Sequence, residues 1–230
     1  MRKTLPGFIA GLFLLAVSAG AALATDKAEA ELKVKEAEVV VGQIMNSPDS
    51  SIPSDLVRKA RAVVIFPGMV KAGFIVGGQY GAGLVVARQA DGHFGAPAFY
   101  TMGGVSAGLQ IGAQAVDVIM LVMNQKGLDG ILHNKVKFGA DIGVAAGPVG
   151  RRAEAGVTGA DLYADVYSYS RAKGAFAGVS LEGGGLEYDA QTTKAFYGRA
   201  LTATEILSKG AVAPPPSAQA LIKVINAMAK

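Results

Sequence analysis

The stretch VVIFPGMVKAGFIVGGQYGAGLVVARQ, residues 63–89, decides the fold. It mixes β-branched residues with repeated glycines, and it predicts a short strand at 63–66 that ends at Pro67-Gly68, then strands at 71–79 and 80–89. Glycine weakens a strand unless the sheet bends sharply or another backbone approaches closely. The recurrence of glycine inside strands therefore predicts a strongly coiled, half-closed sheet.

The strand pattern continues toward the carboxy terminus. Asp91-Gly92 predicts a hairpin turn between strands at 84–89 and 94–100. Asn124 is expected to cap a short helix that runs through Leu132. Further strands are predicted at 105–114, 116–123, 136–145, 153–159, 161–170, 175–181 and 185–188.

Helices are predicted on both sides of the strand region. Residues 26–46 form an amphipathic pattern, and a second short helix is expected to begin near Ser54. Thr202 and Glu205 have capping-box spacing, and the Pro214–Pro216 spacer precedes a last helix. The apolar positions of the first helix are Ala30, Val34, Ala37, Val41 and Ile44. The expected fold class is α+β, with a coiled, largely antiparallel, half-closed barrel-like sheet flanked by amino-terminal, central and carboxy-terminal helices.

Composition limits the chemistry that the chain can perform. The 230 residues include 31 Gly, two His and no Cys. The lack of cysteine excludes a disulfide scaffold, a cysteine-ligated zinc site and a thiol nucleophile. Two histidines disfavour a multi-histidine metal site. We expect no metal, no cofactor and no catalytic residues.

The amino terminus has the features of a secretory leader. Arg2 and Lys3 precede an uncharged apolar run at 8–22, and Ala22-Leu23-Ala24 offers a cleavage site. An uncleaved membrane anchor is the alternative. Cleavage would place the protein in the periplasm or outside the cell, with peripheral contact to the envelope as an option. It would also lower the formal charge from +4 to +2, because 20 basic residues would remain against 18 acidic ones. Nucleic acid is therefore not an expected partner.

Positive charge is concentrated locally instead. Arg58, Lys59, Arg61 and Lys71 lie within 14 residues that contain no acidic residue. A solvated polar surface is one interpretation. The functional interpretation is attraction to anionic headgroups, aided by the apolar positions of the first helix.

One motif supports an enzymatic alternative. Gly104-Val105-Ser106-Ala107-Gly108 matches the G-x-S-x-G pattern of serine hydrolases, in which a tight strand-to-helix turn exposes the nucleophile. The residues that follow predict a strand rather than a helix, and the only downstream histidine is His133. A third hypothesis is a structural protein of the envelope whose terminal helices serve assembly.

Several blocks in fixed order resemble a known family. They span about residues 35–210 and are similar to the SYLF domain family, a lipid-binding domain also found in bacterial secreted proteins. The blocks are Ile52-Pro53, Lys71-Ala72-Gly73-Phe74, Gly77-Gly78, the glycine repeat at 104–112, Gly147–Arg151, Tyr167–Ser170, Phe176-Ala177-Gly178 and Leu181-Glu182-Gly183.

The resemblance implies a non-enzymatic module that binds anionic membrane lipid, with an amphipathic amino-terminal helix as a membrane contact. It also explains the serine motif as part of a family sheet. Actin binding belongs to the eukaryotic relatives, and protein partners of this chain stay open. The expected divisions are a leader at 1–24, the helix at 25–50, the lipid-binding domain at 51–210, and the spacer with its helix at 211–230. The candidate lipid-binding residues are Arg58, Lys59, Arg61, Lys71, Val34, Val41 and Ile44.

Overall fold

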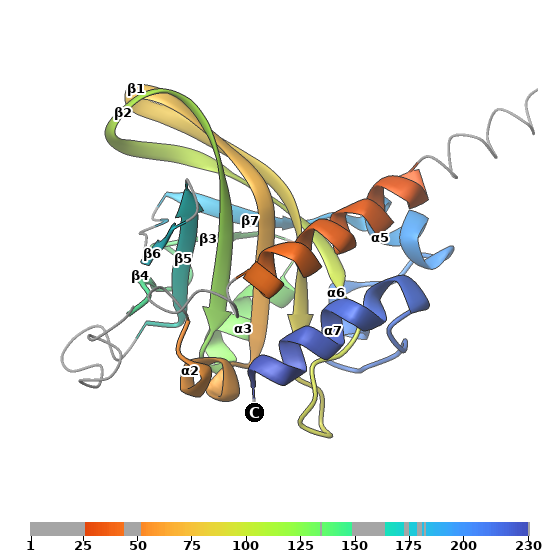
Figure 1. The fold of residues 1–230 in the computed structure, drawn as a ribbon. Coiled ribbons are helices and arrows are strands. Elements are labelled where there is room, and N and C mark those ends of the chain that lie inside the picture. The colour runs from red at the N-terminus through yellow and green to blue at the C-terminus, as the bar shows by residue number, and fades with distance from the viewer. Residues whose placement is uncertain are drawn as a thin grey trace, which may run out of the picture.

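The centre of the fold is a bent two-stranded ribbon made of β1 (Ala62–Ala87) and β2 (Ala98–Val122). The computed structural model describes residues 26–43, 52–133, 135–148, 164–172, 175–178, 181 and 183–229; for 73–76, 106–113, 172 and 175–178 it describes the backbone alone. The strands pair antiparallel from Ala62 opposite Val122 to Val85 opposite Ala98. Both turn over together at their middle and descend again, so the ribbon has two legs (Figure 1). The first leg holds residues 62–72 and 114–122, and the second holds 77–87 and 98–105.

Pro67-Gly68 does not end a strand, as the sequence predicted, but forms a bulge inside one. The pairing register shifts between Phe66 and Met69. Gly68 has a φ of 59°, which favours glycine, and its N–H donates to Asp117 Oδ1 at 2.9 Å. A bulge accommodates proline because the extra residue needs no ladder hydrogen bond. The strands predicted at 63–66, 71–79 and 80–89 are therefore one continuous strand.

The other strand predictions were right in kind but wrong in several boundaries. The hairpin turn is confirmed at Gly92, where φ is 83°, whereas the strands predicted at 94–100, 105–114 and 116–123 merge into β2. The strand predicted at 136–145 is two short strands, β3 (Lys135–Lys137) and β4 (Val144–Ala146), because Gly139 turns the chain with a φ of 86°. The predicted leader and the strand at 153–159 lie outside the described residues.

The remaining strands extend the sheet from the free edge of β2. On the first leg, β5 (Val166–Ala172) pairs antiparallel with β2 and carries β6 (Ala175–Gly178) antiparallel and β4 parallel. On the second leg, β7 (Gly184–Tyr188) pairs with β2 and carries β3. The described residues thus form a seven-stranded, mixed, mainly antiparallel sheet, which confirms the predicted α+β class and the strong curl.

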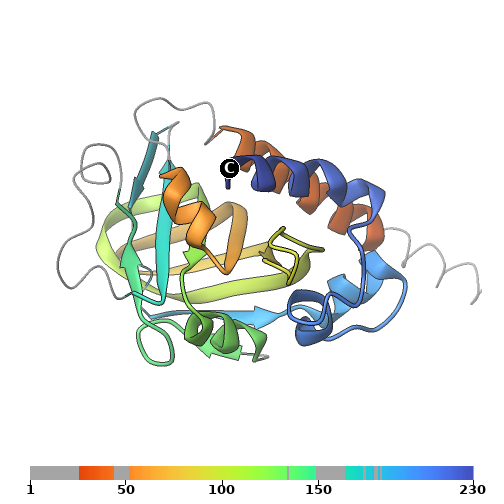
Figure 2. The same cartoon turned by 90° about the horizontal axis from the view of Figure 1, so that it is seen from below.

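Two apolar clusters lie on opposite faces of the curled ribbon. The inner cluster includes Phe66, Met102 and Met120 and is closed by α3 (Gln125–Leu132) and α6 (Ala203–Leu207). The outer cluster includes Ile65 and Phe99. It is covered by the helix at 26–43, α2 (Ser54–Lys59) and α7 (Pro216–Met228). Figure 2 shows the helix at 26–43 beside α7, on the side of the molecule opposite β7.

One helix, α5 (Ala190–Tyr197), was not predicted from the sequence. Its end signals are ordinary: the Asp189 side chain accepts from Thr192 N–H, and Gly198 follows with a φ of 71°. The predicted caps of α3 and α6 are confirmed. Asn124 accepts from Gly127 N–H, and Thr202 and Glu205 form a complete capping box.

A buried carboxylate joins α3 to the β4–β5 edge. Asp165 is 5% exposed and accepts hydrogen bonds from Asn124 Nδ2 at 2.8 Å, Lys126 Nζ at 2.7 Å and Gly143 N–H at 2.8 Å. Burial raises the pKa of this carboxyl, but the hydrogen bonds from Lys126, Gly143 and Asn124 outweigh it, so the pKa lies below its ordinary value.

We expect Asp165→Asn to lower the free energy of unfolding by about 1–3 kcal/mol at pH 7, because it removes charge-assisted bonds and leaves a buried N–H without its acceptor. A carboxyl with a depressed pKa stabilises the fold above its unfolded pKa, and this contribution is lost as pH falls through the folded pKa. The difference between wild type and variant in urea unfolding should therefore shrink as the pH falls below the ordinary range of a carboxyl pKa. A difference that is constant with pH would contradict an ionised Asp165.

Candidate functional site

The helix at 26–43 has apolar residues on two faces. Val34 and Val41, predicted to contact lipid, are 0% and 1% exposed and pack into the outer cluster. In this conformation they have no surface to offer a membrane. Leu32 and Val39 are 59% and 48% exposed, and because they are seven positions apart they lie on one face of the helix. Ile44 lies outside the described residues.

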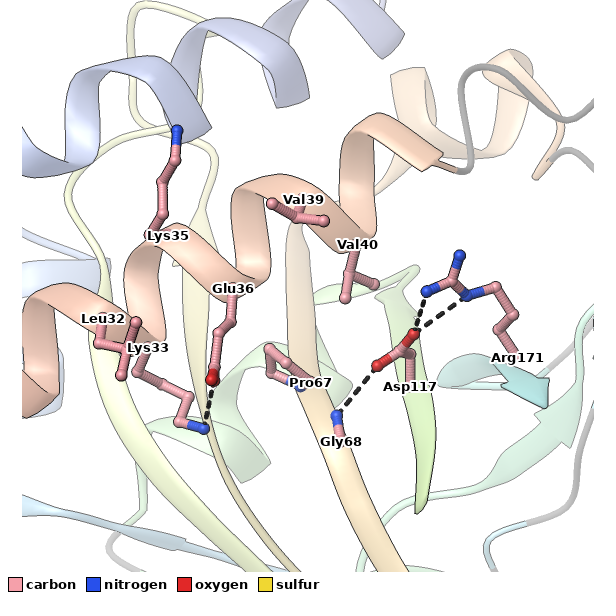
Figure 3. A pocket seen from close by; sticks show the side chains of 10 residues that line it. All are labelled: Leu32, Lys33, Lys35, Glu36, Val39, Val40, Pro67, Gly68, Asp117 and Arg171. Carbon is pink, nitrogen blue, oxygen red and sulfur yellow. Dashed lines mark hydrogen bonds and ion pairs between the residues drawn. The ribbon is translucent and has the colours of Figure 1, made fainter. Parts of the chain in front are cut away.

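The exposed face of this helix borders a groove of about 430 Å³. Helix residues form one wall, the β1 bulge forms the floor, and an ion pair from β2 and β5 forms the other wall (Figure 3). The lining residues are Leu32, Lys33, Lys35, Glu36, Val39, Val40, Pro67, Gly68, Asp117 and Arg171. The groove therefore combines apolar side chains with charged ones, which suits an amphipathic ligand.

The ion pair that closes the groove is fixed on several sides. Arg171 Nε and Nη2 donate to Asp117 Oδ2 at 3.0 and 2.6 Å, while Gly68 N–H donates to the other carboxylate oxygen. Both side chains are mostly buried, with 21% of Arg171 and 16% of Asp117 exposed. Such a charge-assisted pair forms a rigid wall rather than a mobile surface charge.

The charges on the helix itself do not favour anionic lipid. Residues 26–43 carry five acidic residues against three lysines. Each lysine is held by an acidic side chain one turn away: Lys27 by Glu31, Lys33 by Glu36 and Lys35 by Glu38. Attraction to anionic headgroups must therefore come from other elements.

Three of the predicted cations do lie together, at α2 and the start of β1. Arg58, Lys59 and Arg61 are all exposed, and we call them the basic end. Arg58 also forms an ion pair with Asp55 in its own helix. α2, which carries Arg58 and Lys59, covers the same face of the sheet as the helix at 26–43, which borders the groove (Figure 2).

A fourth cation, Arg88, which was not among the predicted site residues, packs beneath the basic end. Arg88 donates to the carbonyls of Val57, Arg58 and Ala60 at 3.0–3.1 Å, and its guanidinium lies 4.3 Å from the centre of the Phe94 ring. Burial and repulsion from Arg61 lower the pKa of the Arg88 guanidinium. Arg88 thus donates hydrogen bonds to the carbonyls at the end of α2 and holds this helix in place.

Lys71 does not belong to the basic end. It lies nine residues along β1 from Ala62, which corresponds to about 25–30 Å of strand. It is 5% exposed, and no described residue forms an ion pair with it. Burial lowers the pKa of its ammonium group. The structure therefore places Lys71 within the fold and apart from the other three predicted cations.

The serine motif lies in the middle of a strand. Residues 104–108 belong to β2, with Ser106 opposite Gly77 of β1, so the backbone does not make the strand-to-helix turn that a hydrolase elbow requires. His133 ends α3, and its Nδ1 lies 2.6 Å from the carbonyl oxygen of Asp129. Its ring is therefore engaged within its own helix.

Comparison with known proteins shows the family of this chain. A family described as "Ysc84: Las17-binding protein actin regulator" matches residues 103–228, more than half of the chain. The chain belongs to the Ysc84 family. This is also the SYLF domain that the sequence blocks resembled, a family associated with actin regulation and lipid binding and generally not catalytic. No solved structure matches.

Similar Ysc84-family proteins are longer. LAS seventeen-binding protein 3 of Saccharomyces cerevisiae is 36% identical over 183 residues, which are 79% of this chain and 39% of the yeast protein. Protein YSC84 of the same organism is 33% identical over 199 residues, 86% of this chain and 42% of that protein. SH3 domain-containing YSC84-like protein 1 of Mus musculus is 32% identical over 182 residues, 79% and 53% of the two chains. The chain therefore matches between about two fifths and one half of these relatives.

The structure adds residues that sequence reasoning missed. Leu32 and Val39 had a detectable signal, since their spacing places them on one helical face. Asp117 and Arg171 had none, because they are 54 positions apart and meet only through the pairing of β2 with β5. None of the helices in the described part of the chain is both long and apolar enough to cross a bilayer.

Proposed function

We propose that this Ysc84-family domain is an exported, non-enzymatic module that binds anionic phospholipid at a membrane surface. The observation that carries the proposal is the exposed basic end on the same side of the sheet as the exposed Leu32 and Val39. Arg58, Lys59 and Arg61 attract headgroups. The Leu32 and Val39 side chains contact the lipid interface, together with the groove that lies between them and Arg171. Val34 and Val41 act instead by holding the helix to the sheet.

The charges set the strength of this contact. Each basic residue near an anionic surface contributes about 1 kcal/mol, so three give reversible adhesion that weakens with salt. The family description names actin regulation and Las17 binding, properties that belong to the proteins it describes. Because a leader is predicted at 1–24, we propose lipid rather than actin as the ligand of this chain.

Vesicle flotation of residues 25–230 tests the proposal. We expect binding to phosphatidylglycerol-containing vesicles, little binding to pure phosphatidylcholine, and at least about 30-fold weaker partitioning for Lys59→Glu with Arg61→Glu. The matched control is Lys194→Glu with Lys209→Glu, which changes net charge equally but at α5 and after α6, away from α2 (Figure 1). Lys71→Met should bind as the wild type does and be equally or more stable, since it removes a buried charge.

Three results would contradict the proposal: binding that is indifferent to phosphatidylglycerol, equal losses in both double reversals, or cosedimentation with actin filaments in place of vesicles. A loss of binding by folded Lys71→Met would instead restore Lys71 to the lipid contact.

A further inference from the structure

A second pocket lies on the same face of the sheet as the outer cluster, but over β3, β7 and the second leg of the ribbon. It is built on one row of residues that face each other across four strands. Lys137 of β3 is opposite Gly185 of β7, Gly185 is opposite Gly103 of β2, and Gly103 is opposite Tyr80 of β1. Directly opposite residues point to the same face of a sheet. A cation and an aromatic ring therefore flank two positions that have no side chain.

This pocket has the size of a small ring compound. Its volume is about 310 Å³, and its lining includes Thr101, Lys135 and Glu187 beside the row just described. The Tyr80 side chain is 63% exposed. A tyrosine ring left in solvent beside a flat backbone floor offers an amphipathic stacking surface.

The ammonium group of Lys137 has no ion pair among the described residues, although its backbone N–H donates to Asp141 Oδ2 at 2.7 Å. Lys135 Nζ lies 3.1 Å from Glu187 Oε2, so these two side chains balance each other. The described part of the chain gives Lys137 no ion pair, and its side chain is exposed. The pocket thus complements a ligand with a single negative charge.

We propose that this pocket binds an acidic sugar, a pyranose ring that carries one carboxylate. The C–H face of the ring stacks on Tyr80, the glycine floor admits the ring close to the backbone, and the carboxylate pairs with Lys137. The Thr101 hydroxyl and the Glu187 carboxylate offer partners for ring hydroxyls. A lipid chain fits poorly, because the charged side chains of Lys135, Lys137 and Glu187 line the pocket beside Tyr80. A nucleic acid strand would need a longer basic track.

The proposal is independent of lipid binding, since this pocket shares no lining residue with the groove and contains no residue of the basic end. It is tested on residues 25–230 by ¹H–¹⁵N NMR titration with glucuronic acid, with glucose and inorganic phosphate as the two partial ligands. We expect saturable shifts of the Gly103 and Gly185 amides with glucuronic acid. Lys137→Gln and Tyr80→Ala should each weaken binding, the former at least about tenfold. Lys194→Gln, which removes a charge on α5, should leave it unchanged.

Gly103→Val is the sharpest variant. A Cβ at this position would meet only ordinary contacts, with Tyr80 Cδ2 at 3.9 Å and Gln79 O at 4.0 Å, so the strand should accept valine while the floor of the pocket is filled. We expect a folded protein without glucuronic acid binding. The proposal is overturned by unshifted Gly103 and Gly185 amides, by equal affinity for glucose, by equal affinity for phosphate alone, or by a Gly103→Val variant that binds as the wild type does.

Discussion

Replacing Gly83 by alanine is expected to lower the free energy of unfolding by about 3–5 kcal/mol, which is a large part of the stability of a typical domain. Gly83 lies where the two legs of the ribbon touch. A Cβ built on it would lie 2.2 Å from the Ile65 carbonyl oxygen and 2.6 Å from Cδ1 of the Phe66 ring. The ring could turn, but the carbonyl belongs to a paired strand and cannot move without breaking the curl.

Thermal unfolding followed by circular dichroism measures this effect, and we expect the melting temperature to fall by roughly 10–15 °C. Gly78→Ala is the matched control. Gly78 lies in the same strand, and a Cβ on it would have no neighbour within 4 Å, so its stability should change by less than about 0.5 kcal/mol. Equal destabilisation by both variants would mean that glycine acts through strand flexibility rather than through the contact between the legs.

The glycines explain why the fold class was predictable while its central element was not. Glycine repeated inside strands indicates that another backbone approaches closely at these positions, and close approach of backbones implies a curled sheet. The two segments that approach each other are far apart in the sequence: Gly83 contacts Ile65 because the ribbon turns over between them. The bulge at Gly68 likewise depends on Asp117, about 50 positions away. Because a proline-glycine pair commonly marks a turn, the sequence alone predicted that a strand ends at Pro67-Gly68.

The candidate site was likewise predictable from the sequence only in part. Arg58, Lys59 and Arg61 lie within four positions at a helix end, so sequence spacing was enough to predict that they form one surface. Lys71 follows Arg61 by ten positions, but about 25–30 Å of strand lies between it and the start of β1, and Lys71 is buried. A stretch without acidic residues reports local charge, but the strand geometry decides which of its cations share a surface.

Substitutions in the first helix are expected to have the second large effect. Its buried apolar face contributes to stability, and its exposed apolar face contributes to lipid binding. We expect Val34→Asn with Val41→Asn to lower the free energy of unfolding by at least about 4 kcal/mol, since it creates voids and buries two amides. Leu32→Asn with Val39→Asn should cost only about 0.5 kcal/mol, through helix propensity. Neither pair changes the charge of the protein, so headgroup attraction is the same in both.

Flotation with phosphatidylglycerol vesicles then distinguishes two ways in which the helix could meet a membrane. If the helix stays docked on the sheet, the Leu32→Asn, Val39→Asn variant should bind at least about tenfold more weakly, because two apolar side chains no longer enter the lipid interface. The folded fraction of the Val34→Asn, Val41→Asn variant should then bind as the wild type does. If the helix leaves the sheet to bury Val34 and Val41 in lipid, the losses are reversed, and undocking exposes Ile65 and Phe99. The acidic charge of residues 26–43 opposes such transfer to an anionic surface, because five carboxylates would follow the helix against three lysines. Charge and burial therefore both favour the docked helix, with membrane contact made by its outward face and by the basic end.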